Sequence, residues 1–268
     1  MKNKILFSCL GTLVIATLIT VWVRGVDAIN QSETDSALTL KVSSDKQTYV
    51  LGEAVKLNFE VLNETDKAIA LPYSPDVSTG YLNVWIASSN QEFKQYSNTS
   101  WGRKEYSGPT LQPEQSFKSQ ATILWNNKPE TSHLNPDAAK RAAEGRIMAD
   151  YAFPTAGVYL IKAVLWFPEI KLKVESKPIQ IVVNEPVGDE LEVWNKIKDN
   201  GKIAYFIQKG DFPTAKDEER GKLLKEVEQI VQIYPNSFLV SQINQSLEKF
   251  RVNEERRKKF MEKLKRPQ

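Results

Sequence analysis

The side chains that most often perform catalysis or bind metals are scarce in this sequence. It contains one histidine, His133, and one cysteine, Cys9. Sites built from two histidines, disulfides and cysteine nucleophiles are therefore excluded from the chain after Cys9. A Ser-His-Asp triad would have to use His133, and no Gly-x-Ser-x-Gly motif accompanies it. We interpret His133 as a surface residue and expect neither a metal nor another cofactor.

Carboxylates are the remaining candidates for acid-base chemistry. Glycoside hydrolysis needs only two Asp or Glu side chains at a suitable separation, which sequence spacing does not reveal. The sequence contains no glycine-rich phosphate loop and no Asp-x-Asp-x-Asp-Gly calcium loop. Its acids are scattered through predicted turns and polar helix faces, where solvation is their usual role. We expect no enzyme, with a two-carboxylate hydrolase as an alternative.

A polar stretch from Asn98 to Pro109 carries Trp101, Arg103 and Tyr106. Aromatic rings provide rigid contact area and a guanidinium provides a planar fork of donors, so these three residues are the candidate ligand-binding site. The alternative is that Trp101 folds back over the edge of the protein. Three further tryptophans lie in predicted strands, and we expect them in the core: Trp85, Trp125 and Trp166.

The amino terminus predicts export. Lys2 and Lys4 precede an uncharged run from Ile5 to Val23, and Val26-Asp27-Ala28 suits a signal peptidase. Residues 1–28 are therefore a signal peptide that is cut after Ala28, or an uncleaved anchor, since residues 5–23 are just long enough to span about 30 Å of hydrocarbon. Both alternatives place the rest of the chain outside the cytoplasm.

Residues 37–185 read as an all-β region. Leu38-Thr39-Leu40-Lys41-Val42 and the segment from Val55 to Val61 alternate apolar with polar residues, which predicts strands with one buried face. Further predicted strands are Leu82–Ala87, Phe117–Leu124, Ile147–Phe153, Val158–Trp166 and Ile179–Val183. This many short strands indicate a sandwich of two antiparallel sheets. A short helix is expected to interrupt them between Asn135 and Gly145.

Two motifs carry a family resemblance. The segment from Ser44 to Glu53, followed by a strand and Asn63-Glu64-Thr65-Asp66, resembles bacterial immunoglobulin-like and macroglobulin-type domains. The segment from Phe153 to Ile161 is similar to the corner before a late strand of such sandwiches. The resemblance implies an immunoglobulin-like fold, with Tyr159 as the corner tyrosine and Ile161 in the second cysteine position.

Residues 189–268 change to a helical period after a boundary near Asn184 to Asp189. One helix is expected from Asp189 to Asp199, ended by Asn200-Gly201. A second is capped at Thr214 and stopped by Pro235, and a third carries an apolar face. The apolar faces consist of Leu191, Trp194 and Ile197; Leu223, Leu224, Val227, Ile230, Val231 and Tyr234; and Leu239, Ile243, Leu247 and Phe250. The last two helices resemble one tetratricopeptide-like hairpin.

The carboxyl-terminal segment after Phe250 is rich in arginine and lysine. Glu254 and Lys258, and Glu255 and Lys259, have the spacing of favourable helical pairs. We expect a solvated basic helix, with an anion-binding arm as the alternative.

Composition names no partner. The formal charge is +3, with 41% hydrophobic and 26% charged residues, which favours neither nucleic acid nor a membrane surface for the chain as a whole. We expect a non-catalytic binding or scaffolding protein of the cell envelope, secreted or periplasmic, with a protein or polysaccharide partner and with membrane contact through residues 5–23 if they are retained. An inhibitor of an extracellular enzyme is the first alternative, because small bacterial immunoglobulin-like domains include proteinase inhibitors.

Overall fold

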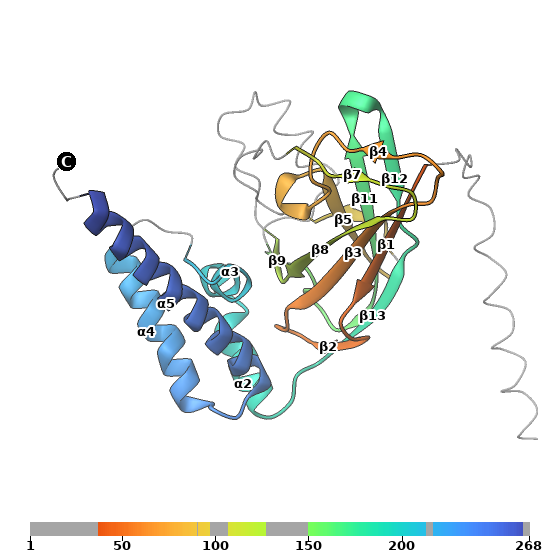
Figure 1. Cartoon of the computed structure of the whole chain (residues 1–268). Coiled ribbons are helices and arrows are strands. Elements are labelled where there is room, and N and C mark those ends of the chain that lie inside the picture. The colour runs from red at the N-terminus through yellow and green to blue at the C-terminus, as the bar shows by residue number, and fades with distance from the viewer. Residues whose placement is uncertain (1–36, 90, 97–106, 127–149, 213–216, 265–268) are drawn as a thin grey trace, which may run out of the picture. The chain divides into compact units, whose positions relative to one another are not determined.

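The computed structural model describes residues 37–89, 91–96, 107–126, 150–212 and 217–264. Two parts of the fold are visible in Figure 1, a group of strands and a group of helices that follows it in the chain. The predicted short helix between Asn135 and Gly145 and the predicted cap at Thr214 lie outside the described residues. Among the described residues, no helix has the length and apolar character needed to cross a membrane.

The strands and short 3-10 helices occupy the first part of the described chain. They are β1 (Leu38–Ser44), β2 (Thr48–Val50), β3 (Val55–Asn63), β4 (Ile69–Ala70), η1 (Val77–Thr79), β5 (Leu82–Ser88), β6 (Lys94–Gln95), β7 (Thr110–Leu111), β8 (Ser116–Ile123), β9 (Trp125–Asn126), β10 (Asp150–Tyr151), β11 (Gly157–Phe167), η2 (Pro168–Ile170), β12 (Leu172–Glu175) and β13 (Ile179–Asn184).

These strands form an immunoglobulin-like sandwich. One sheet has the order β1-β3-β8, and the other has the order β2-β13-β11-β5-β6, with β12 also pairing with β11. Two short ribbons, β4-β7 and β9-β10, complete the arrangement of the described strands. Each sheet combines early strands with later ones, so the chain crosses between the two sheets several times, as in immunoglobulin-like domains.

The paired strands of the described chain are antiparallel except at one edge. β2 pairs in parallel with β13, through Tyr49 and Val183. The reason is that the chain leaves the first sheet after β1 and crosses to the second before β2. β2 therefore lies beside β13, a strand of the sheet opposite to that of β1.

The predicted alternation accounts for the core of the sandwich. In β3 the side chains of Val55, Leu57, Phe59 and Val61 are all buried, while the polar residues between them face outward. The same alternation in β11 buries Tyr159 and the inward-facing residues that follow it. Packing these inner faces together removes apolar surface from water, which is the main source of stability of such a fold.

The corner residues behave as the resemblance implies. The Tyr159 hydroxyl donates a hydrogen bond to the backbone oxygen of Thr155 at 2.8 Å, which fixes the turn into β11. Ile161, two residues later, is completely buried. An aliphatic side chain therefore fills the core position that a disulfide occupies in related domains.

The positions of three tryptophans differ from the prediction that they lie in the core. Trp166 is 39% exposed, so its assignment to the core is wrong. Its neighbours Leu165 and Phe167 point inward, and the period of two along a strand therefore turns Trp166 outward. Trp85 and Trp125 are half-buried rather than in the core, for the same reason of strand alternation.

Four helices follow in the described chain. They are α2 (Asp189–Ile197), α3 (Gly201–Lys209), α4 (Asp217–Ile233) and α5 (Phe238–Leu264). The predicted apolar faces of α4 and α5 are confirmed, because Leu223, Val227 and Ile230 are buried with the inward face of α5. The sequence did not predict α3 as a helix, since Asn200-Gly201 was interpreted as a terminator.

Asn200 instead begins α3. Its side-chain oxygen accepts hydrogen bonds from the backbone N–H groups of Lys202 at 3.2 Å and Ile203 at 3.3 Å. Asparagine is a favoured N-cap because these first N–H groups have no partner within the helix. The same Asn-Gly pair therefore separates two helices that follow each other closely.

The sandwich and the helices share one apolar core. Ala37–Gln268 is one compact unit, and one cluster of buried side chains runs from the sheets through α2, α3, α4 and α5. Polar contacts also cross the junction: the Tyr151 hydroxyl donates to the Ile197 backbone oxygen at 2.9 Å. Gln242 accepts from Ala54 N and donates to Gly52 O, both at 2.9 Å. The division into one domain of residues 37–185 and another of residues 189–268 stays a prediction.

Candidate functional site

The residues first expected to bind a ligand are not described by the structure. Trp101, Arg103 and Tyr106 lie outside the described residues, and so does His133. Their assignment stays a prediction. The described residues form a candidate site elsewhere, where the sandwich meets the helices.

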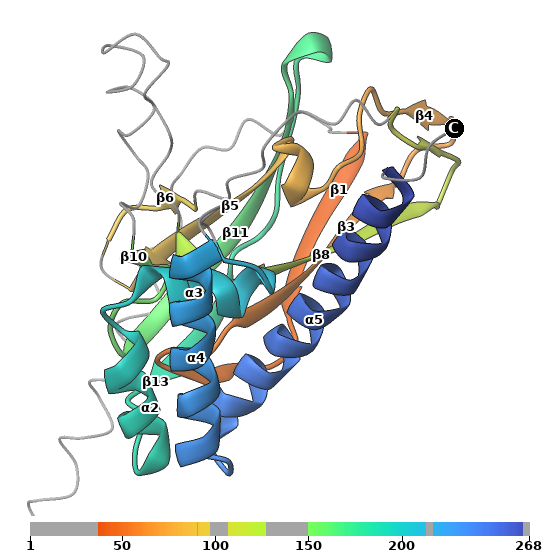
Figure 2. The same ribbon diagram turned by 90° about the vertical axis from the view of Figure 1, so that its left-hand side faces the viewer.

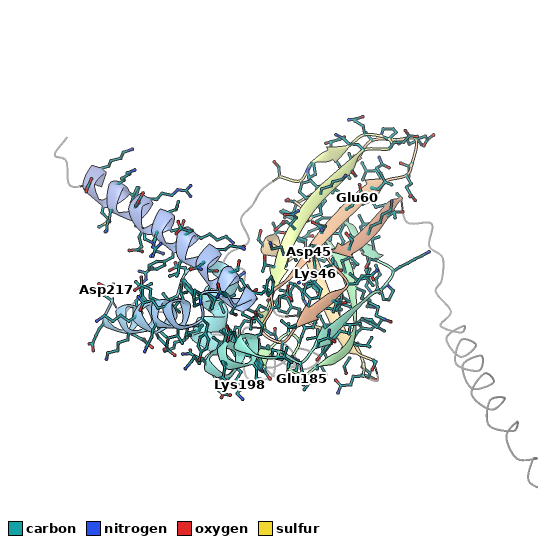
Figure 3. The ribbon with its side chains drawn as sticks, turned by 90° about the horizontal axis from the view of Figure 1, so that it is seen from below. Asp45, Lys46, Glu60, Glu185, Lys198 and Asp217 are labelled. Atoms are coloured by element: carbon teal, nitrogen blue, oxygen red, sulfur yellow. The ribbon has the colours of Figure 1, made fainter. Side chains whose placement is uncertain are left out.

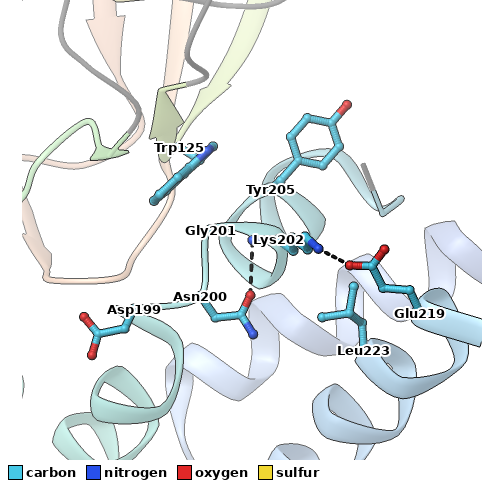
Figure 4. Close-up of a pocket in the computed structure, with 8 residues that line it drawn as sticks. All are labelled: Trp125, Asp199, Asn200, Gly201, Lys202, Tyr205, Glu219 and Leu223. Carbon is cyan, nitrogen blue, oxygen red and sulfur yellow. Dashed lines mark hydrogen bonds and ion pairs between the residues drawn. The ribbon is translucent and has the colours of Figure 1, made fainter. Parts of the chain in front are cut away.

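A hollow of about 550 Å³ opens where the sandwich meets the helices. We call it the junction hollow. Figure 4 shows that Trp125 reaches it from β9 of the sandwich, whereas α3 and α4 provide the opposite side. Its lining residues are Trp125, Asp199, Asn200, Gly201, Lys202, Tyr205, Glu219 and Leu223.

Trp125 is held in place from three directions. Its backbone N–H donates to the side-chain oxygen of Gln208 on α3 at 2.6 Å. Its ring packs edge to face on Tyr151, with the ring centres 5.2 Å apart. Gly201 lies so close that a Cβ atom there would approach the Trp125 ring to 2.4 Å. The indole therefore forms a pre-organised apolar wall.

The first turn of α3 supplies the polar groups of the hollow. The Lys202 ammonium forms an ion pair with Glu219 of α4, as Figure 4 shows. Asn200 caps the helix through its oxygen, and its amide nitrogen donates to Glu226 at 3.4 Å. Asp199 adds a further carboxylate at the rim. These side chains present both donors and acceptors to a bound molecule.

Tyr205 provides a second ring, one turn after Gly201. Burial, with a smaller contribution from the charge of Asp211, raises the pKa of Tyr205 above its ordinary value. Its phenol therefore stays protonated at neutral pH and is able to donate a hydrogen bond to a ligand. Together with Trp125 and Leu223, it makes the hollow partly apolar.

The junction hollow combines aromatic with charged side chains. Two aromatic side chains offer apolar contact area, and Lys202, Glu219 and Asp199 surround them with charge. No group of three His, Cys, Asp or Glu side chains that suits a metal occurs in the part of the chain that the structure describes. This surface therefore offers apolar contact together with donors and acceptors of hydrogen bonds.

A smaller hollow of about 200 Å³ lies between the sandwich and α5. Lys46 is one of the residues that line it. The Lys46 ammonium pairs with Glu53 and lies 4.9 Å from the centre of the Tyr49 ring and 4.8 Å from the centre of the Phe238 ring. Figure 3 shows Lys46 and its neighbour Asp45 at the part of the sandwich that faces the helices. Burial raises the pKa of Glu53 although Lys46 opposes the shift.

The residues of the junction hollow were not found by sequence reasoning. Trp125 was expected in the core, and Lys202 and Tyr205 lie on a helix that the sequence did not predict. The one available signal was the Asn200-Gly201 pair, which marks a cap and a close approach as well as a helix end.

No family model matches the chain, and no curated protein matches it. Some solved structures resemble it weakly. A β-glucosidase from Erythrobacter marinus is 10% identical over 56% of this chain and 16% of its own length, with a TM-score of 0.28.

Two other solved structures give similar values. The sporulation control protein of Bacillus subtilis is 14% identical over 61% of this chain and 56% of its own, with a TM-score of 0.31. The CARDB domain of a Pyrococcus furiosus protein is 10% identical over 55% of this chain and 94% of its own, with a TM-score of 0.25. The chain thus spans less than two thirds of the first two proteins. At these TM-scores the likenesses carry no argument about function, and the β-sandwich followed by helices rests on the strands and helices described above.

Proposed function

We propose that this protein is a non-catalytic binding module that works outside the cytoplasm and holds a segment of an envelope polysaccharide in the junction hollow. The observation that carries the proposal is the fixed Trp125 ring, which faces an ion pair and a second aromatic side chain across the hollow. Lys2, Lys4 and the uncharged run from Ile5 to Val23 support export.

A saccharide suits the hollow better than a charged metabolite. One face of a pyranose ring is made of C–H groups, which pack on an indole, and its edge carries hydroxyls that both donate and accept hydrogen bonds. Lys202 and Glu219 supply partners of both kinds, and their charges already neutralise each other. A neutral ligand therefore does not have to separate this ion pair, whereas an anion would also be repelled by the carboxylate of Asp199.

The finer family resemblances belong to the same proposal. We propose that the sandwich derives from bacterial immunoglobulin-like or macroglobulin-type modules, and that α4 and α5 correspond to one tetratricopeptide-like hairpin. The short connection Tyr234-Pro235-Asn236-Ser237 between two amphipathic helices supports this correspondence.

The test is a fluorescence titration of the purified exported chain with soluble chitotetraose, cellotetraose and maltotetraose as probes. We expect one of the three to change the tryptophan emission with a saturable dependence on concentration. Tyr205→Ala, and separately the double change Lys202→Gln with Glu219→Gln, should weaken that binding about tenfold, because each removes a wall or an oriented pair of polar groups.

The matched control removes a different ion pair from the surface of α4. The Lys222 ammonium and the Glu218 carboxylate are 2.7 Å apart, both side chains are largely exposed, and neither residue lines the hollow. Lys222→Gln with Glu218→Gln should leave the affinity unchanged. Binding that is equally strong in the Tyr205 variant, or no binding of any of the three probes, contradicts the proposal.

A further inference from the structure

The apolar stripe of α5 continues beyond the part of the helix that other elements cover. Leu239, Ile243, Leu247 and Phe250 are buried against the other helices. The helical period brings Met261 onto the same side, about three turns further along, and places Phe260 about a quarter of a turn away around the helix. Both are exposed, Phe260 by 62% and Met261 by 53%.

Two ion pairs show where along α5 the neighbouring helix α4 begins. Arg220, in the first turn of α4, pairs with Glu254 at 3.1 Å, and Arg257 reaches Asp211 at 2.6 Å. The beginning of α4 therefore lies beside residues 254–257 of α5. Figures 1 and 2 both show the last turns of α5 extending past α4.

These last turns are also strongly basic. Arg256, Lys259 and Lys263 follow each other at spacings of three and four, so they form one row next to Phe260. All three are exposed, and within the described part of the chain none has an ion pair. Lys258 adds a further cation, whereas Glu262 is the one acid between Arg256 and Lys263.

We propose that the end of α5, residues 255–264, docks on the surface of a bilayer that contains anionic phospholipid. An exposed Phe-Met pair beside a row of cations is what a helix needs to lie in a membrane interface, with the apolar side chains among the acyl chains and the cations at the phosphates. A second copy of the chain fits worse, because it brings the same positive charges to the contact. The docking is independent of the saccharide site, since the two share no residue.

The test measures binding to lipid vesicles by sedimentation, using residues 37–268, which form one compact unit with its own core. This range leaves out the amino-terminal apolar run, which would insert by itself. We expect binding to vesicles of phosphatidylcholine with phosphatidylglycerol, little binding to phosphatidylcholine alone, and a loss of binding as salt is raised.

Two sets of variants separate the two contributions. Phe260→Ser with Met261→Ser should lower the partition coefficient at least tenfold, because both apolar insertions are lost. Arg256→Gln, Lys259→Gln and Lys263→Gln should each lower it about fivefold. The controls are single changes of exposed lysines elsewhere: Lys67→Gln, Lys222→Gln and Lys225→Gln. Each should have little effect, although each removes one positive charge, as each change in α5 does.

Three outcomes would overturn the proposal. If the Phe260 and Met261 variant bound vesicles as strongly as the unchanged protein, these two side chains would not insert into the bilayer. Equal binding to phosphatidylcholine alone would mean that the cations do not recognise the lipid. Concentration-dependent dimers in sedimentation velocity that disappear in the Phe260 and Met261 variant, without vesicle binding, would assign the surface to a second copy. Circular dichroism of each variant checks that the exposed substitutions leave the helices intact.

Discussion

Gln208 is the residue that most directly joins the helices to the sandwich. It is 6% exposed, and its side-chain oxygen accepts hydrogen bonds from the backbone N–H groups of Leu124 and Trp125 and from the Tyr96 hydroxyl. A buried N–H group without an acceptor lowers the stability of the fold. The Gln208 amide therefore stabilises the packing of α3 against this edge of the sandwich. It also sets the position of Trp125, and with it the apolar wall of the junction hollow.

Glu53 should make stability depend on pH. Burial raises the pKa of Glu53 above its ordinary value of 4.5. At a pH between 4.5 and the raised pKa, Glu53 therefore holds a proton in the folded state and releases it in the unfolded state. The contribution of Glu53 to the free energy of unfolding therefore falls as pH rises from 4.5 through the raised pKa. Glu53→Gln should remove this fall, measured as the difference between urea unfolding curves of the two proteins at several pH values.

The comparison with the variant is needed because other carboxyls act in the opposite direction. The pKa of Glu175 is lowered by the hydrogen bonds and charges of Lys162 and Lys173, although burial opposes them. Its contribution is lost as pH falls. A difference between wild type and Glu53→Gln that is constant with pH would contradict the prediction.

The boundary between α2 and α3 decides the geometry of the candidate site. Asn200 caps α3, and Gly201 then lets the helix approach the indole of Trp125 more closely than any residue with a Cβ atom allows. The element is short, but Ile203, Ala204, Phe206 and Ile207 bury its apolar face. Tertiary packing therefore stabilises a helix of a length that is marginal in isolation.

Two glycine substitutions should have opposite effects on stability. Gly201→Ala places a methyl group against the Trp125 ring and should lower the free energy of unfolding by about 1–3 kcal/mol, as overpacking does. Gly221→Ala, in α4, meets no atom within 4 Å and should raise it by about 0.5–1 kcal/mol, because alanine favours the helix. Urea unfolding of both variants measures the two changes. Equal effects of the two substitutions would show that the close approach to Trp125 is not required.

On the scale of the whole molecule, one apolar core connects sandwich and helices. Buried residues such as Leu124, Tyr151, Trp194 and Ile203 belong to the same cluster as the inner faces of the sheets. Glu190 of α2 adds a polar connection, because its carboxylate accepts from the Ser237 hydroxyl and from the first N–H groups of α5. A continuous core of this kind favours unfolding in one step.

Removal of buried volume from α4 should therefore weaken the whole unit. Ile230 is 3% exposed, and Ile230→Ala should lower the free energy of unfolding by about 2–5 kcal/mol. The loss should appear equally in tryptophan fluorescence and in the far-ultraviolet circular dichroism of the helices. Ile233→Ala is the control on the same helix: Ile233 is 51% exposed, and its replacement should cost no more than about 0.5 kcal/mol.

Two separated transitions would contradict this prediction. If the helical signal were lost at lower urea concentration than the tryptophan signal in the Ile230 variant alone, the helices would be a separate folding unit. The boundary near Asn184 to Asp189 would then divide two domains in the thermodynamic sense.

The sequence by itself determined the sandwich, its core faces and the two long amphipathic helices. These features follow from local periods, two residues in the strands around Leu57 and Ile161 and nearly four in α4 and α5, which act within a short segment. The corner at Tyr159 is equally local, because donor and acceptor are four residues apart.

Only the tertiary structure decided the junction hollow and the direction of the tryptophans. Trp125 is far along the chain from Tyr205 and Glu219, which lie on two consecutive helices, and its proximity to them depends on how α3 docks through Gln208. An Asn-Gly pair is compatible with both a helix end and a helix start, and the buried face of α3 selects the second. Local patterns identify which residues are apolar, whereas contacts between distant segments decide which of them form a wall and which a core.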